Sequence, residues 1–262
     1  MQFYRHRFGF SKFTLMALLA GLLTVSCDFP WDPGPMPTDI EKTEFVPGLN
    51  ILGILRADGN AGSSFFRVER AYELSELTKD MKYYLPLEED AKIVVKDSLT
   101  KDSDSFYWSG DRFYRNSDFT AQTGHEYQLR VTSSEFPVLE GVTIIPEPPQ
   151  VELIQATPDS GVVVTVTPDE FTAMVDVYLI YSNGRDIKRL INRDNQPLTM
   201  KFDINDQLGQ LIALEVFAYD QNLAAYLQAD ITIKPQTYQQ MVTTVTGGYG
   251  CFGSLTETRI SF

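Results

Sequence analysis

A run of glycines near the end of the chain has the spacing of a phosphate-binding loop. Gly248, Gly250 and Gly253 form a G-x-G-x-x-G pattern, which can hold a pyrophosphate at the start of a helix. Such a site also needs a following helix and an acidic residue about 20 residues further on. The nine residues after Gly253 have the pattern of a strand. We therefore expect no nucleotide site here, and predict that the glycines allow a bend or bulge in a final hairpin.

The start of the chain is typical of a secretory signal. Residues 1–12 carry three cations among Lys and Arg and no acidic residue, and an apolar run follows over 13–25. This run is shorter than the ~20 apolar residues of a transmembrane helix. It ends in LLTVSC, which resembles the lipobox of bacterial lipoproteins. That resemblance implies cleavage before Cys27, diacylglycerol on its sulfur, and acylation of the new N-terminus, for example by palmitate. A soluble secreted protein and an uncleaved anchor are the alternatives.

The net charge limits the partners that the chain can have. The sequence has 22 Lys and Arg against 35 Asp and Glu, a net charge of −13. Without residues 1–26, which hold three of the cations, the net charge is −16. We expect no cluster of cations for phosphate contacts, and hence no nucleic-acid partner. Because an acidic body avoids anionic lipid, we expect membrane attachment through the acyl chains on Cys27.

The second cysteine, Cys251, has no partner once Cys27 carries lipid. We therefore expect no internal disulfide, although the compartment is oxidising. A single cysteine in the sequence CFG is predicted to be a small, packed apolar side chain and not a nucleophile.

The titratable residues offer few catalytic arrangements. His125 is the one histidine outside residues 1–26, which excludes a multi-histidine metal site and makes any Ser-His-Asp arrangement depend on it. We predict that His125 is an exposed histidine of a hairpin.

The many carboxylates allow a catalytic pair of the kind that hydrolyses glycosides, since their number alone does not exclude one. Four of them crowd residues 96–111 and could offer oxygen ligands to calcium, but without the order of an EF-hand loop, so we favour a solvated acidic loop: Asp97, Asp102, Asp104 and Asp111.

Aromatic residues gather in the same region, as they do in sugar-binding platforms and in β-sandwich cores. Neighbouring residues of a strand point to opposite faces, so one platform cannot use all of them. We therefore favour a role in the core for this set: Phe106, Tyr107, Trp108, Phe113 and Tyr114.

Alternation of apolar and polar residues from residue 45 onward predicts strands with one buried face. In HEYQLRV, Tyr127, Leu129 and Val131 alternate with polar residues. Turn signals separate such runs, for example at 182–184. We predict an all-β chain of two immunoglobulin/fibronectin-like β-sandwiches. The runs that alternate in the same way are 162–166, 175–181, 200–205 and 258–262. Helical patterns are scarce, and short helices are possible over 69–81 and 219–228.

Two proline clusters predict the boundaries between these parts. The prolines after Cys27 forbid a helix and favour an extended tether, and those at 146–149 fall between two predicted strands. The expected order is a signal peptide over 1–26, lipidated Cys27 with its tether over 27–44, and sandwiches over 45–147 and 148–262.

Several segments together resemble a known family. In TGHEYQLRV, Gly124 precedes Tyr127 by three residues, as in the strand of immunoglobulin-like and fibronectin-like domains where a tyrosine packs at a sheet corner. With the lipobox, FVPGLNILGILRADG, FFRVERAY, AKIVVKD, VTIIPEPPQVELI and GGYGCFGS, the chain resembles a domain-of-unknown-function family of Bacteroidetes-type cell-envelope lipoproteins over most of 27–262. Members of that family are often found beside TonB-dependent outer-membrane receptors. The resemblance implies an accessory role at the outer membrane, on its periplasmic face or at the cell surface. Asp28, directly after Cys27, instead resembles the inner-membrane retention signal of enterobacterial lipoproteins, so the sequence leaves both membranes open.

We therefore expect a lipid-anchored envelope protein that is not an enzyme, needs no cofactor or metal, and serves as a binding or assembly accessory. Its expected partners are the membrane, through the acyl chains, and an outer-membrane receptor. An envelope hydrolase with acidic residues in an inter-domain cleft is one alternative, and a structural spacer or adhesin is another. A hydrolase needs a cleft with convergent carboxylates, a binding protein needs an exposed patch, and a spacer needs neither.

Overall fold

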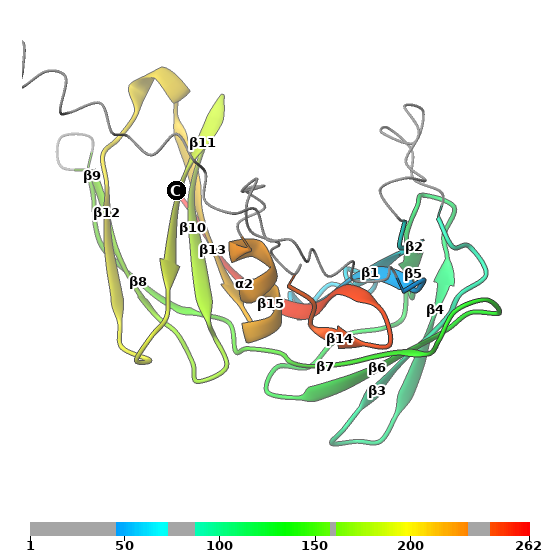
Figure 1. Ribbon diagram of the computed structural model, residues 1–262. Coiled ribbons are helices and arrows are strands. Elements are labelled where there is room, and N and C mark those ends of the chain that lie inside the picture. The colour runs from blue at the N-terminus through cyan, green and yellow to red at the C-terminus, as the bar shows by residue number, and fades with distance from the viewer. Residues whose placement is uncertain (1–45, 73–86, 158–160, 230–241) are drawn as a thin grey trace, which may run out of the picture. The chain divides into compact units, whose positions relative to one another are not determined.

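The computed structural model describes residues 46–72, 87–157, 161–229 and 242–262. The predicted signal peptide, Cys27 and the tether lie outside these residues, as does most of the helix predicted over 69–81. The described part consists mainly of strands (Figure 1), which confirms the all-β prediction. Among the described residues, no helix is long and apolar enough to cross a membrane.

The strands form one large and one small sheet. Their order is β11-β10-β13-β15-β1-β2-β5-β4-β3-β6-β7-β14 in the large sheet and β12-β9-β8 in the small one. Neighbours pair antiparallel except β1 and β15, which are parallel. The strands are β1 (Leu49–Arg56), β2 (Phe65–Arg70), β3 (Lys92–Asp97), β4 (Ser103–Trp108), β5 (Tyr114–Arg115), β6 (Glu126–Thr132), β7 (Leu139–Ile144), β8 (Gln150–Thr157), β9 (Gly161–Thr167), β10 (Met174–Tyr181), β11 (Gly184–Ile191), β12 (Leu198–Phe202), β13 (Leu211–Tyr219), β14 (Val245–Thr246) and β15 (Tyr249–Ser261).

A first hydrophobic core lies among β1 to β7, β14 and the first half of β15. Its aromatic centre includes Phe66 and Phe106, whose ring centroids are 4.7 Å apart, and Phe252 of β15 stacks on Phe66 at 6.0 Å. At the start of β6 the hydroxyl of Tyr127 accepts a hydrogen bond from the amide of Gln122 at 2.9 Å. This is the sheet-corner position expected for that tyrosine.

A second core lies between the small sheet and the strands β11-β10-β13-β15. The buried valines of β9, whose alternation the sequence shows, face the buried side chains of β10 and β13. Three strands form one layer of this sandwich and four strands of the large sheet form the other.

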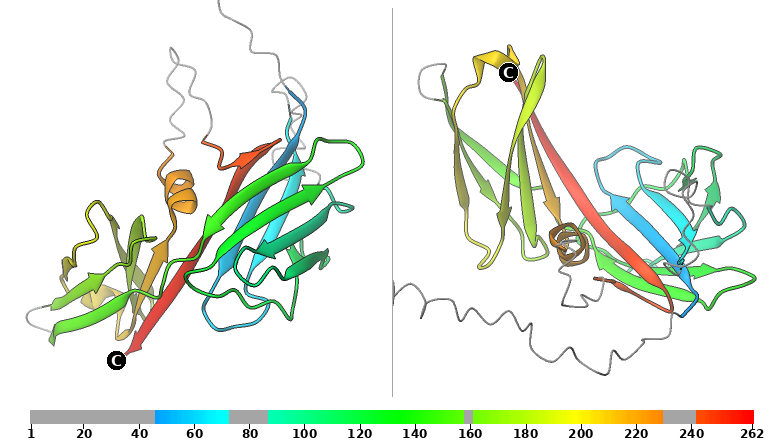
Figure 2. Two further views of the ribbon diagram at one scale, coloured as in Figure 1. Left: turned by 90° about the horizontal axis from the view of Figure 1, so that it is seen from below. Right: turned by 45° about the horizontal axis from the view of Figure 1, so that its top comes forward.

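Strand β15 belongs to both cores. Residues 249–255 pair with β1, and residues 255–261 pair with β13. Figure 2 shows it as one long strand that passes from the first group of strands to the second. By their contacts, residues 45–262 form one compact unit, and the division at 147/148 stays a prediction about domains.

The helix α2 (Gln221–Gln228) covers β15 where the two cores meet. It confirms the helix predicted over 219–228, and it begins after its N-cap residue Asp220, whose side chain accepts from the amide of Leu223. A Cβ atom at Gly253 would lie 2.8 Å from the Cβ atom of Leu223. Only glycine therefore allows the helix to approach β15 so closely.

Candidate functional site

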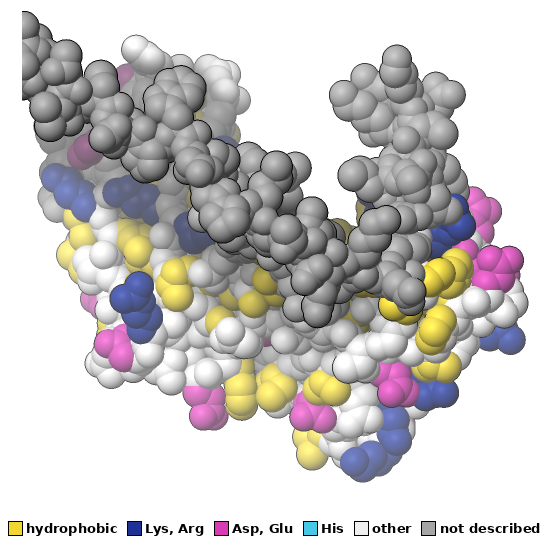
Figure 3. Space-filling view, viewed as in Figure 1, with side chains coloured by type: hydrophobic (Ala, Val, Ile, Leu, Met, Phe, Trp, Pro, Cys, Tyr) yellow, Lys and Arg dark blue, Asp and Glu magenta, His cyan; other side chains and the backbone are white. Residues whose placement is uncertain are grey.

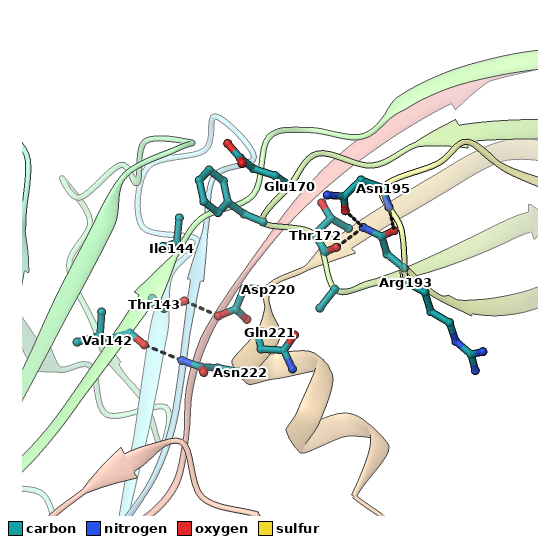
Figure 4. A pocket seen from close by; sticks show the side chains of 13 residues that line it. Val142, Thr143, Ile144, Glu170, Thr172, Arg193, Asn195, Asp220, Gln221 and Asn222 are labelled. Atoms are coloured by element: carbon teal, nitrogen blue, oxygen red, sulfur yellow. Dashed lines mark hydrogen bonds between the residues drawn. The ribbon is translucent and has the colours of Figure 1, made fainter.

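A cavity lined by many polar side chains lies where α2, the end of β7 and two loops meet. It has a volume of about 380 Å³ and is called here the junction pocket (Figure 4). Volumes of this size suit a small ligand or one side chain of a partner. Its lining comes from residues 142–144 of β7, the loop before β10 at 170–173, the loop after β11 at 192–195, and residues 220–222.

Asp220 is the buried acid of the junction pocket. Its Oδ1 accepts from the amides of Leu223 and Ser254 at 2.9 and 3.0 Å, and its Oδ2 accepts from the hydroxyl of Thr143 at 2.6 Å. Burial raises the pKa of Asp220 above its usual range, although these hydrogen bonds act in the opposite direction. Because both oxygens are already engaged, this carboxylate joins elements of the fold and has little capacity left for a ligand.

Other polar groups of the junction pocket are available to a ligand. The amides of Asn192 and Asn222 donate to backbone carbonyl groups and so support the walls. By contrast, the side chains of Glu170, Arg193 and Gln221 make no hydrogen bond to the described part of the chain. The pocket thus offers one carboxylate, one guanidinium and one amide from three different elements.

The structure places His125 against an aspartate. Its Nδ1 lies 2.7 Å from Oδ2 of Asp97, whose other oxygen accepts from the amides of Leu99 and Thr100. Burial disfavours the charged form of Asp97, but the hydrogen bonds from His125 and from these amides lower its pKa below the ordinary value. His125 is thus a paired and partly covered residue.

This pair resembles two members of a Ser-His-Asp arrangement without the third. The nearest hydroxyl in sequence to Asp97, that of Ser98, donates to Glu126 at 2.8 Å. In the described ranges no hydroxyl is hydrogen-bonded to His125. The pair therefore stabilises the β3–β4 turn, and among the described residues no hydroxyl nucleophile is placed beside it.

The four acidic residues considered as calcium ligands, for which we favour a solvated loop, form no common cluster. Asp97 is already hydrogen-bonded to His125 and to two backbone amides. Asp102 and Asp104 lie at the start of β4. Asp111 follows the other end of that strand and pairs with Arg115. Within the described residues no group of three or more side chains is placed to hold a metal ion.

The aromatic residues of this region point to opposite faces of β4, as predicted. Phe106 is buried in the first core, whereas the neighbouring Tyr107 is 68% exposed. Trp108 packs on Tyr114 with ring centroids 5.5 Å apart. A single exposed ring remains, which is not enough for a stacking platform.

Cys251 and two glycines of the pattern, Gly250 and Gly253, lie inside β15, and Gly248 directly precedes this strand. A strand follows Gly253, so the pattern lacks the helix of a dinucleotide site. Gly250, with φ of 100°, allows β15 to pair closely with β1, because a Cβ atom there would lie 2.0 Å from the carbonyl oxygen of Ile51. Cys251 is fully buried under α2.

One feature was missed in the sequence, namely the free edge of β11. Residues 185–201 hold five cations and two acids, a local net charge of +3, which contradicts the expectation that cations are nowhere clustered. A charge count over short windows of the sequence would have found it. Figure 3 shows Lys and Arg side chains gathered over the second sandwich, among hydrophobic ones.

The fold and the site together define an all-β protein with a polar pocket and a free, cationic sheet edge. The chain belongs to the family described as domain of unknown function DUF4249, whose model matches residues 35–261.

Among solved structures, one similar chain is a tetra-tandem repeat in the extending region of a large adhesion protein. The identity is 11%, the TM-score is 0.25, and the alignment covers 83% of this chain and 49% of that one. This chain thus spans about half the length of that structure. The TM-score is too low to indicate a shared fold. No curated protein matches the chain.

Proposed function

We propose that this protein is a lipid-anchored accessory of the bacterial cell envelope that binds a protein partner and catalyses no reaction. The observation that carries the proposal is the sequence LLTVSC at 22–27, after a charged segment and an apolar run and before a proline-rich stretch. Acyl chains on Cys27 would confine the folded residues to a membrane surface. The prolines would leave them free to reach a partner.

A receptor of the outer membrane is the partner that we propose. This choice rests on the resemblance to envelope lipoproteins found beside TonB-dependent receptors. Anchoring both proteins in one membrane raises their effective concentration, so a modest interface is enough for a lasting complex. The free edge of β11 and the junction pocket offer binding surface without a cofactor or metal.

Copurification from the native membrane tests the proposal. Cells are crosslinked mildly, membranes are solubilised, and proteins attached to the full chain are identified by mass spectrometry. We expect a larger outer-membrane protein, and much less of it with Cys27→Ala, which lacks the acylated residue. Recovery of the protein alone, at monomer size in several detergents, would contradict the proposal.

A hydrolase is the second candidate, because the junction pocket holds two carboxylates, Glu170 and Asp220. The test is turnover of glycosides, esters and peptides by the full chain, compared with Glu170→Gln. Turnover that this substitution abolishes would favour the hydrolase. We expect none, since the hydrogen bonds of Asp220 already engage it with three elements of the fold, β7, α2 and β15.

A further inference from the structure

Among the residues that the structure describes, strand β11 is an edge strand whose outer backbone groups pair with no other strand. It is the first strand of the large sheet, and its one neighbour there is β10. In antiparallel pairing, only alternate residues bond to the neighbour. The amide of Asn192 donates to the carbonyl of Ala173 at 2.9 Å, which fixes this alternation along the strand. The residues whose amide and carbonyl groups point away from the sheet are therefore Arg185, Ile187, Arg189 and Ile191.

The side chains of this strand do not block its edge. Charged residues on edge strands commonly prevent further pairing by extending across the edge. Here the guanidinium of Arg185 lies 5.2 Å from the ring centroid of Tyr178, and that of Arg189 forms two hydrogen bonds with buried Asp176, at 2.6 and 2.7 Å. On the opposite face, the ammonium group of Lys188 lies over the ring of Phe202. All three cations thus point back over the protein.

Two apolar side chains on this edge are exposed to solvent. Ile187 is 49% and Ile191 is 38% exposed. Both occupy the outer face of the sheet, where they alternate with Arg185 and Arg189. A long edge with exposed apolar residues is the kind of surface to which another strand adds.

The charge of the edge selects among possible occupants. A second copy of the chain pairing through the same strand would bring two segments of net charge +3 together, which like-charge repulsion disfavours. An acidic segment would instead gain attraction. The guanidinium of Arg185 forms no ion pair within the described residues, so it is available to a carboxylate of the partner.

We propose that β11 binds an extended, acidic segment of the protein partner as an added strand of the large sheet; this inference rests on the proposed function. Backbone groups of 185–191 supply the hydrogen bonds. One face of the added strand carries a carboxylate opposite Arg185, whose guanidinium has no ion pair among the described residues, and apolar side chains opposite Ile187 and Ile191. The backbone gives the affinity and this pattern gives the specificity.

Site-specific photocrosslinking in intact cells tests the site of contact. A photoreactive amino acid replaces Ile187 in the full chain, and in a matched control it replaces Ile154, which is 57% exposed on β8 of the other sheet. We expect an adduct from position 187, at least tenfold more than from 154, joined to an acidic segment of the partner. An adduct with a second copy of the chain would overturn the inference.

The outcomes separate this inference from the proposed function. If general crosslinking recovers a partner and position 187 gives no adduct with it, the edge inference is wrong and the accessory function stands. If neither method recovers a partner, the proposed function fails and the inference fails with it.

Two substitutions test the mechanism of binding. Ile187→Pro removes an amide that the fold does not use, so we expect at least a tenfold loss of copurified partner at an unchanged melting temperature, whereas Ile187→Val keeps the amide and should behave as wild type. Arg185→Glu keeps every backbone amide and reverses the charge that would attract the partner, so it should also reduce copurification. This variant tests the proposal even if the proline variant does not fold. Normal copurification by Arg185→Glu would contradict the need for an acidic segment.

Discussion

At position 220, one side chain joins a helix, a strand of the first core and the shared strand β15. Its carboxylate caps α2 and also accepts from Thr143 and Ser254. Asp220→Ala removes all of these acceptors, and loss of the cap alone costs about 0.5–2 kcal/mol. We therefore expect a lower melting temperature for this variant than for Asp220→Asn, whose amide oxygen can still accept from both backbone amides. Equal losses for the two variants would contradict a capping role.

The pH dependence of stability gives a second measurement on Asp220. Because burial raises its pKa in the folded state, the folded protein binds this proton more tightly than the unfolded chain does. The associated stability is then fully present below the unfolded pKa of about 3.9 and is lost as the pH rises through the folded pKa. The melting temperature of wild type should improve relative to that of Asp220→Asn as the pH falls from 7 to about 4. A difference that is constant with pH would contradict the raised pKa.

Cys251 should be unreactive in the folded protein. Burial raises the pKa of its thiol to about 12, and the thiolate is the form that reacts. We expect slow labelling by a thiol reagent in buffer and rapid labelling in urea. Cys251→Ser should cost about 1–3 kcal/mol of stability, because the buried hydroxyl group would need a hydrogen-bond partner. Rapid and complete labelling without denaturant would show that the cysteine is accessible.

Single residues differ in how far the sequence determines their surroundings. The packing of Cys251 follows from its apolar, glycine-rich neighbours, and the structure places it in a core. The contact of His125 with Asp97 does not follow, because the two are 28 positions apart and meet only through the pairing of β3 with β6. Local patterns carry no information on that register.

At the scale of elements, the approach of α2 to β15 depends on the missing side chain at Gly253. Gly253→Ala would force the helix outward, and overpacking of this kind costs about 1–3 kcal/mol. The measurement is the denaturation midpoint. Gly110→Ala is the control, since its Cβ atom meets nothing within 4 Å and so reports only the strain of its positive φ. A smaller effect at Gly253 than at Gly110 would contradict the close packing.

The strands themselves were largely predictable, and their order was not. The period of two located the buried faces of β6, β9 and β10, because one side of each strand meets a core. The division of β15 between two cores could not be read in this way, since its partners, β1 and β13, lie far from it in sequence. Likewise, the free edge of β11 depends on which strands are neighbours, and no single segment contains that information.

For the whole molecule, lipidation of Cys27 stays a prediction with a direct test. Cys27→Ala should move the protein from the membrane fraction to the soluble fraction and remove the acyl mass from its N-terminus, because the acidic body has little affinity of its own for anionic lipid. Cys251→Ala is the matched control, and should leave both properties unchanged. Membrane association that survives Cys27→Ala would exclude the acyl anchor.

The cationic edge of β11 was missed because net charge was counted over the whole chain. A total of −13 averages over the chain, whereas a partner meets only one strand and its neighbours. The prediction of lipidation at Cys27, in contrast, rests on six consecutive residues, LLTVSC, because such a signal is local in sequence and does not depend on which strands become neighbours.

Strand β15 also determines when the protein can fold. Leu49–Arg56 pairs with residues that lie about 200 positions later in the chain, so the first core stays open until residues 249–255 have emerged from the ribosome or the translocation channel. A chain that stops before residue 249 lacks the strand that both cores share, and it exposes their apolar faces to proteases. The first core therefore cannot close before this strand is made, and the second sandwich gains the partner of β13 at the same time.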